Sequence, residues 1–255
     1  QPVPQGECYG IRVNESFFLL AKILSGGLGV ENPQMFETRQ MLEGNAMKLY
    51  CFGESGNAYK CALALELTQT PWQPVYVDFF KGEARSPAFL AINEMGEVPV
   101  LVDGDMTLSQ SGLILQHIAE KTGRLGGADA AEAREIWRWI LWDNHKFSTQ
   151  IGTARFLANF LPEDKRPAGV IPFLQGRIKT AYTVLERHLA GRDWIVGQGV
   201  TIADLSCCSY LYYPEPFGFD RAQWPNIDRW LTSIAALRGW KHPYDLMPGN
   251  PSDRA

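Results

Sequence analysis

The sequence predicts two domains, a small mixed α/β domain followed by an all-helical domain. At 255 residues the chain has about the length of two typical domains. Short apolar runs alternate with a helical pattern in residues 47–125, whereas from residue 131 onward no strand pattern competes with the helical one. Gly123, Gly126 and Gly127 lie between these regions and predict a linker.

Composition excludes several classes of function. The net charge is −4, and no run of Lys or Arg could follow a phosphate backbone, so we expect no nucleic-acid partner. The odd number of cysteines, five, argues against a disulfide framework and favours a reducing cytoplasm. The four histidines stand far apart and the cysteines form no CxxC. We therefore expect no metal and no bound cofactor.

The first 46 residues show no pattern of a strand or helix that would pack with the elements that follow. Their apolar stretch, residues 16–30, contains Lys22 and is shorter than the ~20 residues that span a bilayer, so we expect no membrane segment. We treat residues 1–46 as an N-terminal extension of unknown role. The folded part is expected to begin near Met47.

The first domain is predicted over residues 47–125. Residues 48–52 form an apolar run bounded by Gly53 and predict a buried strand. Residues 60–67 are rich in helix formers, so the turn before them opens a helix. Pro71 and Pro74 bound a second strand at residues 75–79, and a short helix follows at residues 84–90.

The remaining elements of this domain are a hairpin and a helix. Residues 98–102 and 106–108 flank Asp103-Gly104, a strong hairpin signal, and Ser109 is expected to cap a helix whose apolar positions include Leu115 and Ile118. The order β-α-β-(α)-β-β-α predicts a four-stranded mixed sheet, the thioredoxin architecture.

The second domain is predicted as a helical bundle over residues 131–247. One long helix runs from about residue 136 to 160, and a second covers residues 178–189, with Pro162, Pro167 and Pro172 interrupting between them. A third begins at Thr201-Ile-Ala-Asp204, which fits a capping box, so Asp204 is assigned to folding. Residues 227–234 form a fourth.

The turn at residues 54–60 is the first candidate site. Ser55 lies directly before a predicted helix, where free backbone N–H groups and the helix dipole favour an anion. Ser55 alone could equally be an ordinary N-cap. Cys51 lies in the preceding strand, where a buried cysteine usually serves packing.

Five short motifs, in this order and spacing, resemble the cytosolic glutathione transferases, and the resemblance covers about residues 47–246. The motifs are Ser55-Gly-Asn-Ala-Tyr-Lys60, Gly96-Glu-Val-Pro-Val100, Leu108-Ser-Gln-Ser111, Ala154-Arg-Phe156 and Thr201-Ile-Ala-Asp204. A serine-type, bacterial-like member is implied.

This resemblance implies a set of site residues. Ser55, assisted by Asn57, would stabilise the glutathione thiolate, and Tyr59 would also contact glutathione. A cis Val98-Pro99 bond would present the Val98 backbone to the cysteinyl part. Ser111 and its backbone N–H would hold the γ-glutamyl carboxylate at a helix N-terminus, and Gln110 would hydrogen-bond the polar groups of the same γ-glutamyl residue.

Two parts of the predicted site remain open. Lys60, Lys81 and Arg85 are candidates for the glycyl carboxylate, and the sequence does not rank them. Aromatic residues of the helical domain could form an electrophile pocket, although aromatics at helical spacing more often belong to a core. The candidates for that pocket are Trp142, Phe147 and Tyr210.

The expected function is conjugation of glutathione to an electrophilic, largely apolar small molecule, or reduction of a peroxide, in cytoplasmic detoxification by a homodimer. Two alternatives stay open. One is a non-catalytic binding or assembly module with the same fold, since fold does not fix function. The other is a glutathione-dependent thiol-disulfide reductase.

Overall fold

Four strands form one mixed sheet in the order β2-β1-β3-β4. A computed structural model describes residues 46–249, so the predicted extension lies outside the described residues except for its last residue. β1 (Met47–Cys51) is parallel to β2 (Trp72–Tyr76) and antiparallel to β3 (Val100–Asp103), which pairs with β4 (Met106–Ser109). Met47 is thus the first residue of the sheet.

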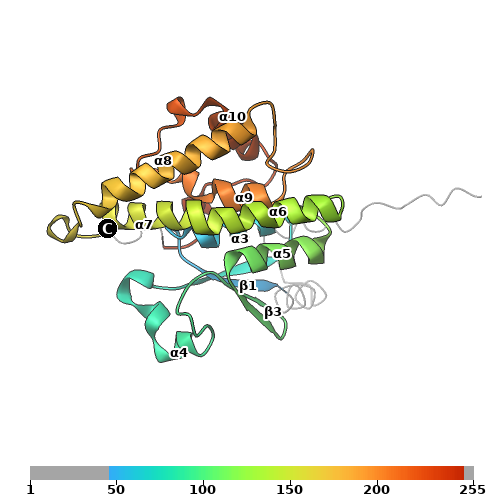
Figure 1. Cartoon of the computed structure of the whole chain (residues 1–255). Helices are drawn as coiled ribbons and strands as arrows, with labels where there is room; N and C mark the ends of the chain where they lie inside the picture. Colours follow the sequence, from blue (N-terminus) through green and yellow to red (C-terminus); the bar gives the residue numbers. More distant parts are fainter. Residues whose placement is uncertain (1–45, 250–255) are drawn as a thin grey trace, which may run out of the picture. The chain divides into compact units, whose positions relative to one another are not determined.

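Helices cover both faces of this sheet, as expected for a thioredoxin-like domain (Figure 1). Leu49 of β1 belongs to a core shared with α3 (Gly56–Thr68) and α5 (Ser111–Thr122). The next residue, Tyr50, points to the opposite face and packs against Phe89 of α4 (Pro87–Leu90). This alternation follows from the two-residue period of a strand. Two short 3₁₀ helices precede α4: η1 (Phe79–Lys81) and η2 (Glu83–Arg85).

The second strand differs from its prediction. β2 begins at Trp72 and ends at Tyr76, so Pro74 lies inside it instead of before it. An edge strand tolerates proline because one side of its backbone needs no ladder partner. The expected end at Phe79 was also wrong: the Asp78 side chain accepts a hydrogen bond from Lys81 N at 3.2 Å and caps η1.

The start of α5 also differs from its prediction. Ser109 is the last residue of β4 and does not cap the helix. Gln110 occupies the cap position with φ of 72°, and its side chain makes no capping bond. Ser111 is therefore the first helical residue, and its backbone belongs to the positive end of α5.

The helical half begins with one long helical rod. α6 (Ala130–Trp142) continues through a π-helical turn, η3 (Asp143–Phe147), into α7 (Ser148–Asn159). After η4 (Glu163–Lys165) comes α8 (Val170–Leu189), which contains Pro172 in its first turn. The first turn accepts proline because its N–H groups have no partner within the helix. α9 (Ile202–Cys208) follows, and after it come η5 (Ser209–Tyr212), η6 (Arg221–Gln223), α10 (Pro225–Ala235) and α11 (Pro243–Leu246).

The predicted capping box opens α9 (Ile202–Cys208). Thr201 Oγ1 accepts from Ala203 N at 3.3 Å, and Asp204 Oδ2 accepts from Thr201 N at 2.8 Å. Asp204 is fully buried and its other oxygen accepts from Ile195 N and Trp230 Nε1, both at 2.9 Å. This carboxylate ties the start of α9 to two distant segments, so its assignment to folding is confirmed.

The two halves share one hydrophobic core, because α9 packs against both α3 and α5. This contact joins α3 and α5 to the helical half. Within residues 46–249, no helix combines the length and the apolar character needed to cross a bilayer.

Candidate active site

The turn between β1 and α3 presents a hydroxyl group at a helix N-terminus. Ser55 is the N-cap of α3, and its Oγ accepts from Ala58 N at 3.1 Å. Its own N–H donates to Phe52 O at 3.0 Å, which fixes the backbone on the other side. Since Oγ acts as acceptor in the cap, the hydroxyl proton can still be donated to a ligand. Capping and anion binding are therefore compatible in this residue.

The segment before β3 faces this turn. The Val98-Pro99 peptide bond is cis, as predicted. The preceding loop is held by Asn93, whose Nδ2 donates to Glu97 O at 2.8 Å, and by Gly96, whose φ is 62°. A side chain at Gly96 would be strained in this conformation and would lie 3.0 Å from Ala84 O. The loop is thereby fixed beside the helix end.

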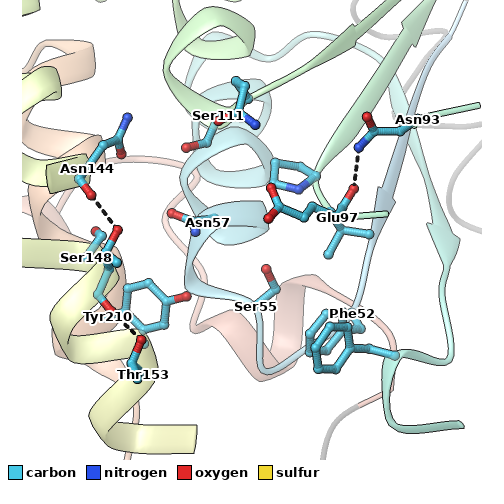
Figure 2. A pocket seen from close by; sticks show the side chains of 16 residues that line it. Phe52, Ser55, Asn57, Asn93, Glu97, Ser111, Asn144, Ser148, Thr153 and Tyr210 are labelled. Atoms are coloured by element: carbon cyan, nitrogen blue, oxygen red, sulfur yellow. Dashed lines mark hydrogen bonds between the residues drawn. The ribbon is translucent and has the colours of Figure 1, made fainter. Parts of the chain in front are cut away.

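These two segments and the start of α5 enclose a cavity of about 500 Å³, here called the main cavity. It brings together seven of the residues singled out in the sequence: Ser55, Asn57, Val98, Pro99, Gln110, Ser111 and Tyr210. Figure 2 shows Ser55, Asn57 and Ser111 on one side and Asn144, Ser148 and Tyr210 on the other. The N-termini of α3 and α5 both open into it, so two helix dipoles favour anionic groups there.

The helical half supplies a polar wall that the sequence prediction missed. Asn144, Ser148, Thr149 and Thr153 line the main cavity together with Gly152. The set Asn144, Ser148 and Gly152 recurs every four residues, the spacing of one helix face. This run of small and polar residues in an otherwise apolar rod was the signal available in the sequence.

Tyr210 closes the cavity between α3 and α7. Its ring has room only because positions 56 and 152 are glycines: a Cβ at Gly56 would lie 2.6 Å from the ring, and one at Gly152 would lie 3.0 Å from the hydroxyl. Burial raises the pKa of Tyr210 above its usual value. The hydroxyl therefore stays protonated, and in Figure 2 it extends toward Asn57 and Ser55.

A second cavity, of about 250 Å³, adjoins the first and shares Tyr210 with it. We call it the aromatic pocket, because five phenylalanines line it: Phe52, Phe79, Phe80, Phe156 and Phe160. Phe52 and Phe79 stack at 4.9 Å between ring centroids, and Phe80 lies 5.3 Å from Phe160. These rings come from the turn after β1, from η1, and from α7 and its C-cap, so both halves build the pocket.

Comparison with known proteins decides the family. The model for the glutathione S-transferase N-terminal domain matches residues 45–120, and that for the C-terminal domain matches residues 154–237. A zeta class glutathione S-transferase of Euphorbia esula is 30% identical over 82% of this chain and 95% of its own length. The chain belongs to the glutathione transferase family.

Other relatives agree with this assignment. The crystal structure of a glutathione S-transferase from Xanthobacter autotrophicus Py2 superposes with a TM-score of 0.72, is 33% identical, and covers 82% of this chain and 99% of its own. The disulfide-bond oxidoreductase YfcG of Escherichia coli K12 is 26% identical over 72% of this chain and 87% of its own length. The relatives of this chain therefore differ in the activity that their names state.

Three predicted site residues lie away from the main cavity. Tyr59 is fully buried, and its hydroxyl donates to Lys241 O at 2.8 Å, so it joins α3 to the C-terminal segment. Phe147 is also fully buried and packs on Tyr182. Trp142 packs on Phe147 and lines a separate cavity near α8. These positions correct the expectation that Tyr59 contacts glutathione and that Trp142 and Phe147 contact an electrophile.

The candidates for the glycyl carboxylate are also placed elsewhere. Lys60 is fully buried, and its Nζ donates to Asp143 Oδ2 at 2.6 Å, which makes it unsuited to a ligand. Asp143 in turn accepts from Ser148 and Ser206, both at 2.7 Å, so the ion pair joins α3, η3 and α9. Lys81 is exposed and pairs with Asp78 at 3.0 Å, and Arg85 does not line the cavity.

Cysteine chemistry is disfavoured in the described part of the chain. The four cysteines there are buried and unpaired, and burial raises the pKa of the Cys51 thiol to about 12 and raises those of the other three: Cys61, Cys207 and Cys208. A thiolate is the reactive form, so these groups are inert at neutral pH. Between residues 46 and 249, no three His, Cys, Asp or Glu side chains are grouped so that they could hold a metal.

Proposed function

We propose that this member of the glutathione transferase family is an enzyme that ionises glutathione with Ser55 and transfers the sulfur to an electrophile. The observation that supports this most is the Ser55 hydroxyl, which is fixed at the N-terminus of α3 and lines the main cavity. Asn57, the second residue of α3, adds an amide to the same surface. We therefore propose a serine-type enzyme, in which a serine hydroxyl stabilises the thiolate.

The free energy of a hydrogen bond from Ser55 is large enough for this role. A free thiol with a pKa near 8.5 is about 3% ionised at pH 7, and lowering the pKa by about two units requires roughly 2.7 kcal/mol. A hydrogen bond to a charged acceptor contributes about 1.5–3 kcal/mol, so Ser55 and the helix end suffice. Ionisation can raise the rate at pH 7 by at most about 30-fold, and any further gain must come from positioning the electrophile.

The rest of glutathione is proposed to lie along the main cavity. The Val98 backbone beside cis-Pro99 would pair with the cysteinyl residue, as an added strand pairs with a sheet edge. Ser111 at the start of α5, with Gln110, would hold the γ-glutamyl carboxylate. Under this proposal, residues 47–125 bind glutathione and residues 131–247 complete the electrophile site.

The electrophile is proposed to occupy the aromatic pocket. Five phenylalanine rings favour an apolar, preferably planar, molecule, such as a chloronitrobenzene or an organic peroxide. The test is turnover of 1-chloro-2,4-dinitrobenzene by the wild type and by Phe160→Ala. We expect the KM for this electrophile to rise in the variant while the KM for glutathione stays within about threefold, since one ring contributes about 0.5–1.5 kcal/mol beyond its area.

A second candidate function is reduction of small disulfides by glutathione. The polar wall of the main cavity, Asn144, Ser148, Thr149 and Thr153, can accept a polar second molecule, and one relative is a disulfide-bond oxidoreductase. Because the described cysteines are buried, the attacking thiolate would be that of glutathione. Reduction of 2-hydroxyethyl disulfide that exceeds conjugation in rate would favour this candidate.

We further propose that the protein acts as a homodimer in the cytoplasm. Leu141 of α6 and Val184 of α8 are large apolar side chains with 63% and 42% exposure, and Leu113 of α5 has 47% exposure. Under this proposal, the second subunit covers these three side chains. Light scattering after size exclusion measures the mass, and a monomer at micromolar concentration would contradict the dimer.

A further inference from the structure

Arg155 of α7 is a buried cation whose hydrogen bonds lead to the Ser55 turn. It is only 2% exposed. Its Nη1 donates to Glu54 O at 2.7 Å, and its Nη2 donates to Glu215 Oε2 at 2.7 Å and to Tyr244 Oη at 2.8 Å. Its Nε donates to the same Glu215 oxygen at 3.0 Å. The guanidinium group thus joins three segments that are far apart in the sequence.

The acceptor on the turn is the peptide that carries Ser55. Glu54 O and Ser55 N belong to one planar peptide unit. Arg155 holds the oxygen of this unit, and Phe52 O accepts from its N–H at 3.0 Å. The peptide is therefore fixed from both sides, and with it the direction of the Ser55 side chain.

Tyr213 reinforces the same contact. Its hydroxyl donates to Gly53 O at 2.7 Å, and its ring lies 3.9 Å from the Arg155 guanidinium carbon. Two successive carbonyl groups of the turn, those of Gly53 and Glu54, are therefore bound by side chains of the helical half. The thioredoxin-like half alone does not supply these donors.

The guanidinium group is itself held in place. Glu215 neutralises it, and Tyr244 donates its hydroxyl proton to the second oxygen of Glu215. Burial, followed by the hydrogen bond to Glu215, raises the pKa of Tyr244, so the phenol stays protonated. Only arginine offers a planar set of donors that can reach a carbonyl, a carboxylate and a phenol at once.

We propose that Arg155 is a positioning residue that holds the Glu54 carbonyl and thereby aims the Ser55 hydroxyl at the glutathione sulfur. The proposal rests on the function proposed above for Ser55. Arg155 also lines the aromatic pocket and lies 5.1 Å from the Phe160 ring centre. The same side chain therefore connects the wall of the electrophile pocket with the group that ionises the thiol.

The test compares the ionisation of bound glutathione in Arg155→Lys and in the wild type. Thiolate absorbance in the ultraviolet is titrated with pH, and kcat and KM for glutathione are measured in parallel. Lysine keeps the charge but loses the planar donors, so we expect the pKa of the bound thiol to rise by about one unit, a tenfold loss of thiolate below that pKa. The KM for glutathione should change by less than about threefold, because the main-chain and carboxylate contacts remain.

Tyr244→Phe serves as the milder variant, because it removes one hydroxyl and leaves the Arg155 contact with Glu54. We expect the pKa of the bound thiol to rise in this variant as well, by about half a unit. If Arg155→Lys does not fold, the titration of Tyr244→Phe tests the positioning role of Arg155. Arg177→Lys, an exposed arginine of α8, is the matched control and should titrate like the wild type.

Ser55→Ala in the same titration separates the two proposals. If glutathione bound to Ser55→Ala titrates like glutathione bound to the wild type, the function proposed for Ser55 is wrong. The positioning role of Arg155 is then wrong as well. If Ser55→Ala raises the pKa of the thiol while a folded Arg155→Lys, or Tyr244→Phe in its absence, leaves it unchanged, only the positioning role of Arg155 is overturned.

Discussion

Replacing Ser55 by alanine removes one hydroxyl donor from the N-terminus of α3 and leaves the helix in place. The hydroxyl oxygen accepts from Ala58 N at 3.1 Å, so its proton is the one available to the sulfur. Loss of a hydrogen bond to a charged acceptor costs about 1.5–3 kcal/mol, which corresponds to a rise of about 1–2 units in the pKa of the bound thiol.

This shift fixes the expected pH dependence. A lowered thiol pKa means that wild-type activity rises with pH through that pKa and then levels off, whereas the Ser55→Ala profile rises at higher pH. At pH 7 we expect the variant to be about 3- to 25-fold slower, and the difference should shrink above about pH 9, where the thiol ionises without help. Burial raises the pKa of Tyr210, so this group adds no descending limb near neutral pH.

The assay is kcat/KM for 1-chloro-2,4-dinitrobenzene from pH 5.5 to 9.5, with thermal unfolding as a measure of stability. Ser86→Ala is the matched control, because Ser86 caps α4 with a bond to Phe89 N at 3.2 Å and does not line the main cavity. Both variants should lose about 1 kcal/mol of stability as caps, and only Ser55→Ala should lose activity. The same pH midpoint for Ser55→Ala and the wild type would show that Ser55 does not lower the pKa of the bound thiol.

Three further predictions follow from the geometry. Asp204→Asn places an amide against buried donors from Ile195, Thr201 and Trp230 and should lower the free energy of unfolding by about 3–5 kcal/mol in urea denaturation; a loss below about 1 kcal/mol would contradict its role. Gly152→Ala should slow conjugation severalfold, since its Cβ would lie 3.0 Å from the Tyr210 hydroxyl and displace it, and should lower the melting temperature only slightly, because the helix propensity of alanine offsets part of the close contact; full activity would show that this hydroxyl can move without consequence. Iodoacetamide at pH 7.5 should leave the activity intact, because burial raises the pKa of every described cysteine, and inactivation that glutathione prevents would point to a reactive thiol in the site.

Local chemistry and motif order predicted much of the thioredoxin-like half of the site. Ser55, Val98-Pro99 and Ser111 lie at the ends of short elements, where turn and helix-end chemistry depends on a few neighbouring residues. The resemblance implied the cis bond before Pro99, and the structure has it. Strand limits were less predictable, because Pro74 is tolerated only through the edge position of β2, which pairing along the whole sheet decides.

The helical half was less predictable for a physical reason. A π-helical turn at Asp143–Phe147 interrupts the 3.6-residue period, so the face that meets the cavity cannot be extrapolated from the apolar pattern. Phe147 therefore lies in the core, while Asn144 and Ser148 reach the cavity. Arg155 stood in a recognised motif, yet its partners are separated from it by 60 to 101 positions in the sequence, and no local pattern joins them.

A crystal structure of the protein with glutathione bound tests the central claim most directly. We expect the sulfur to lie within about 3.5 Å of Ser55 Oγ at the N-terminus of α3, with the γ-glutamyl carboxylate at the start of α5. A sulfur atom held by the Asn57 amide or the Tyr210 hydroxyl, more than about 4 Å from Ser55 Oγ, would contradict it.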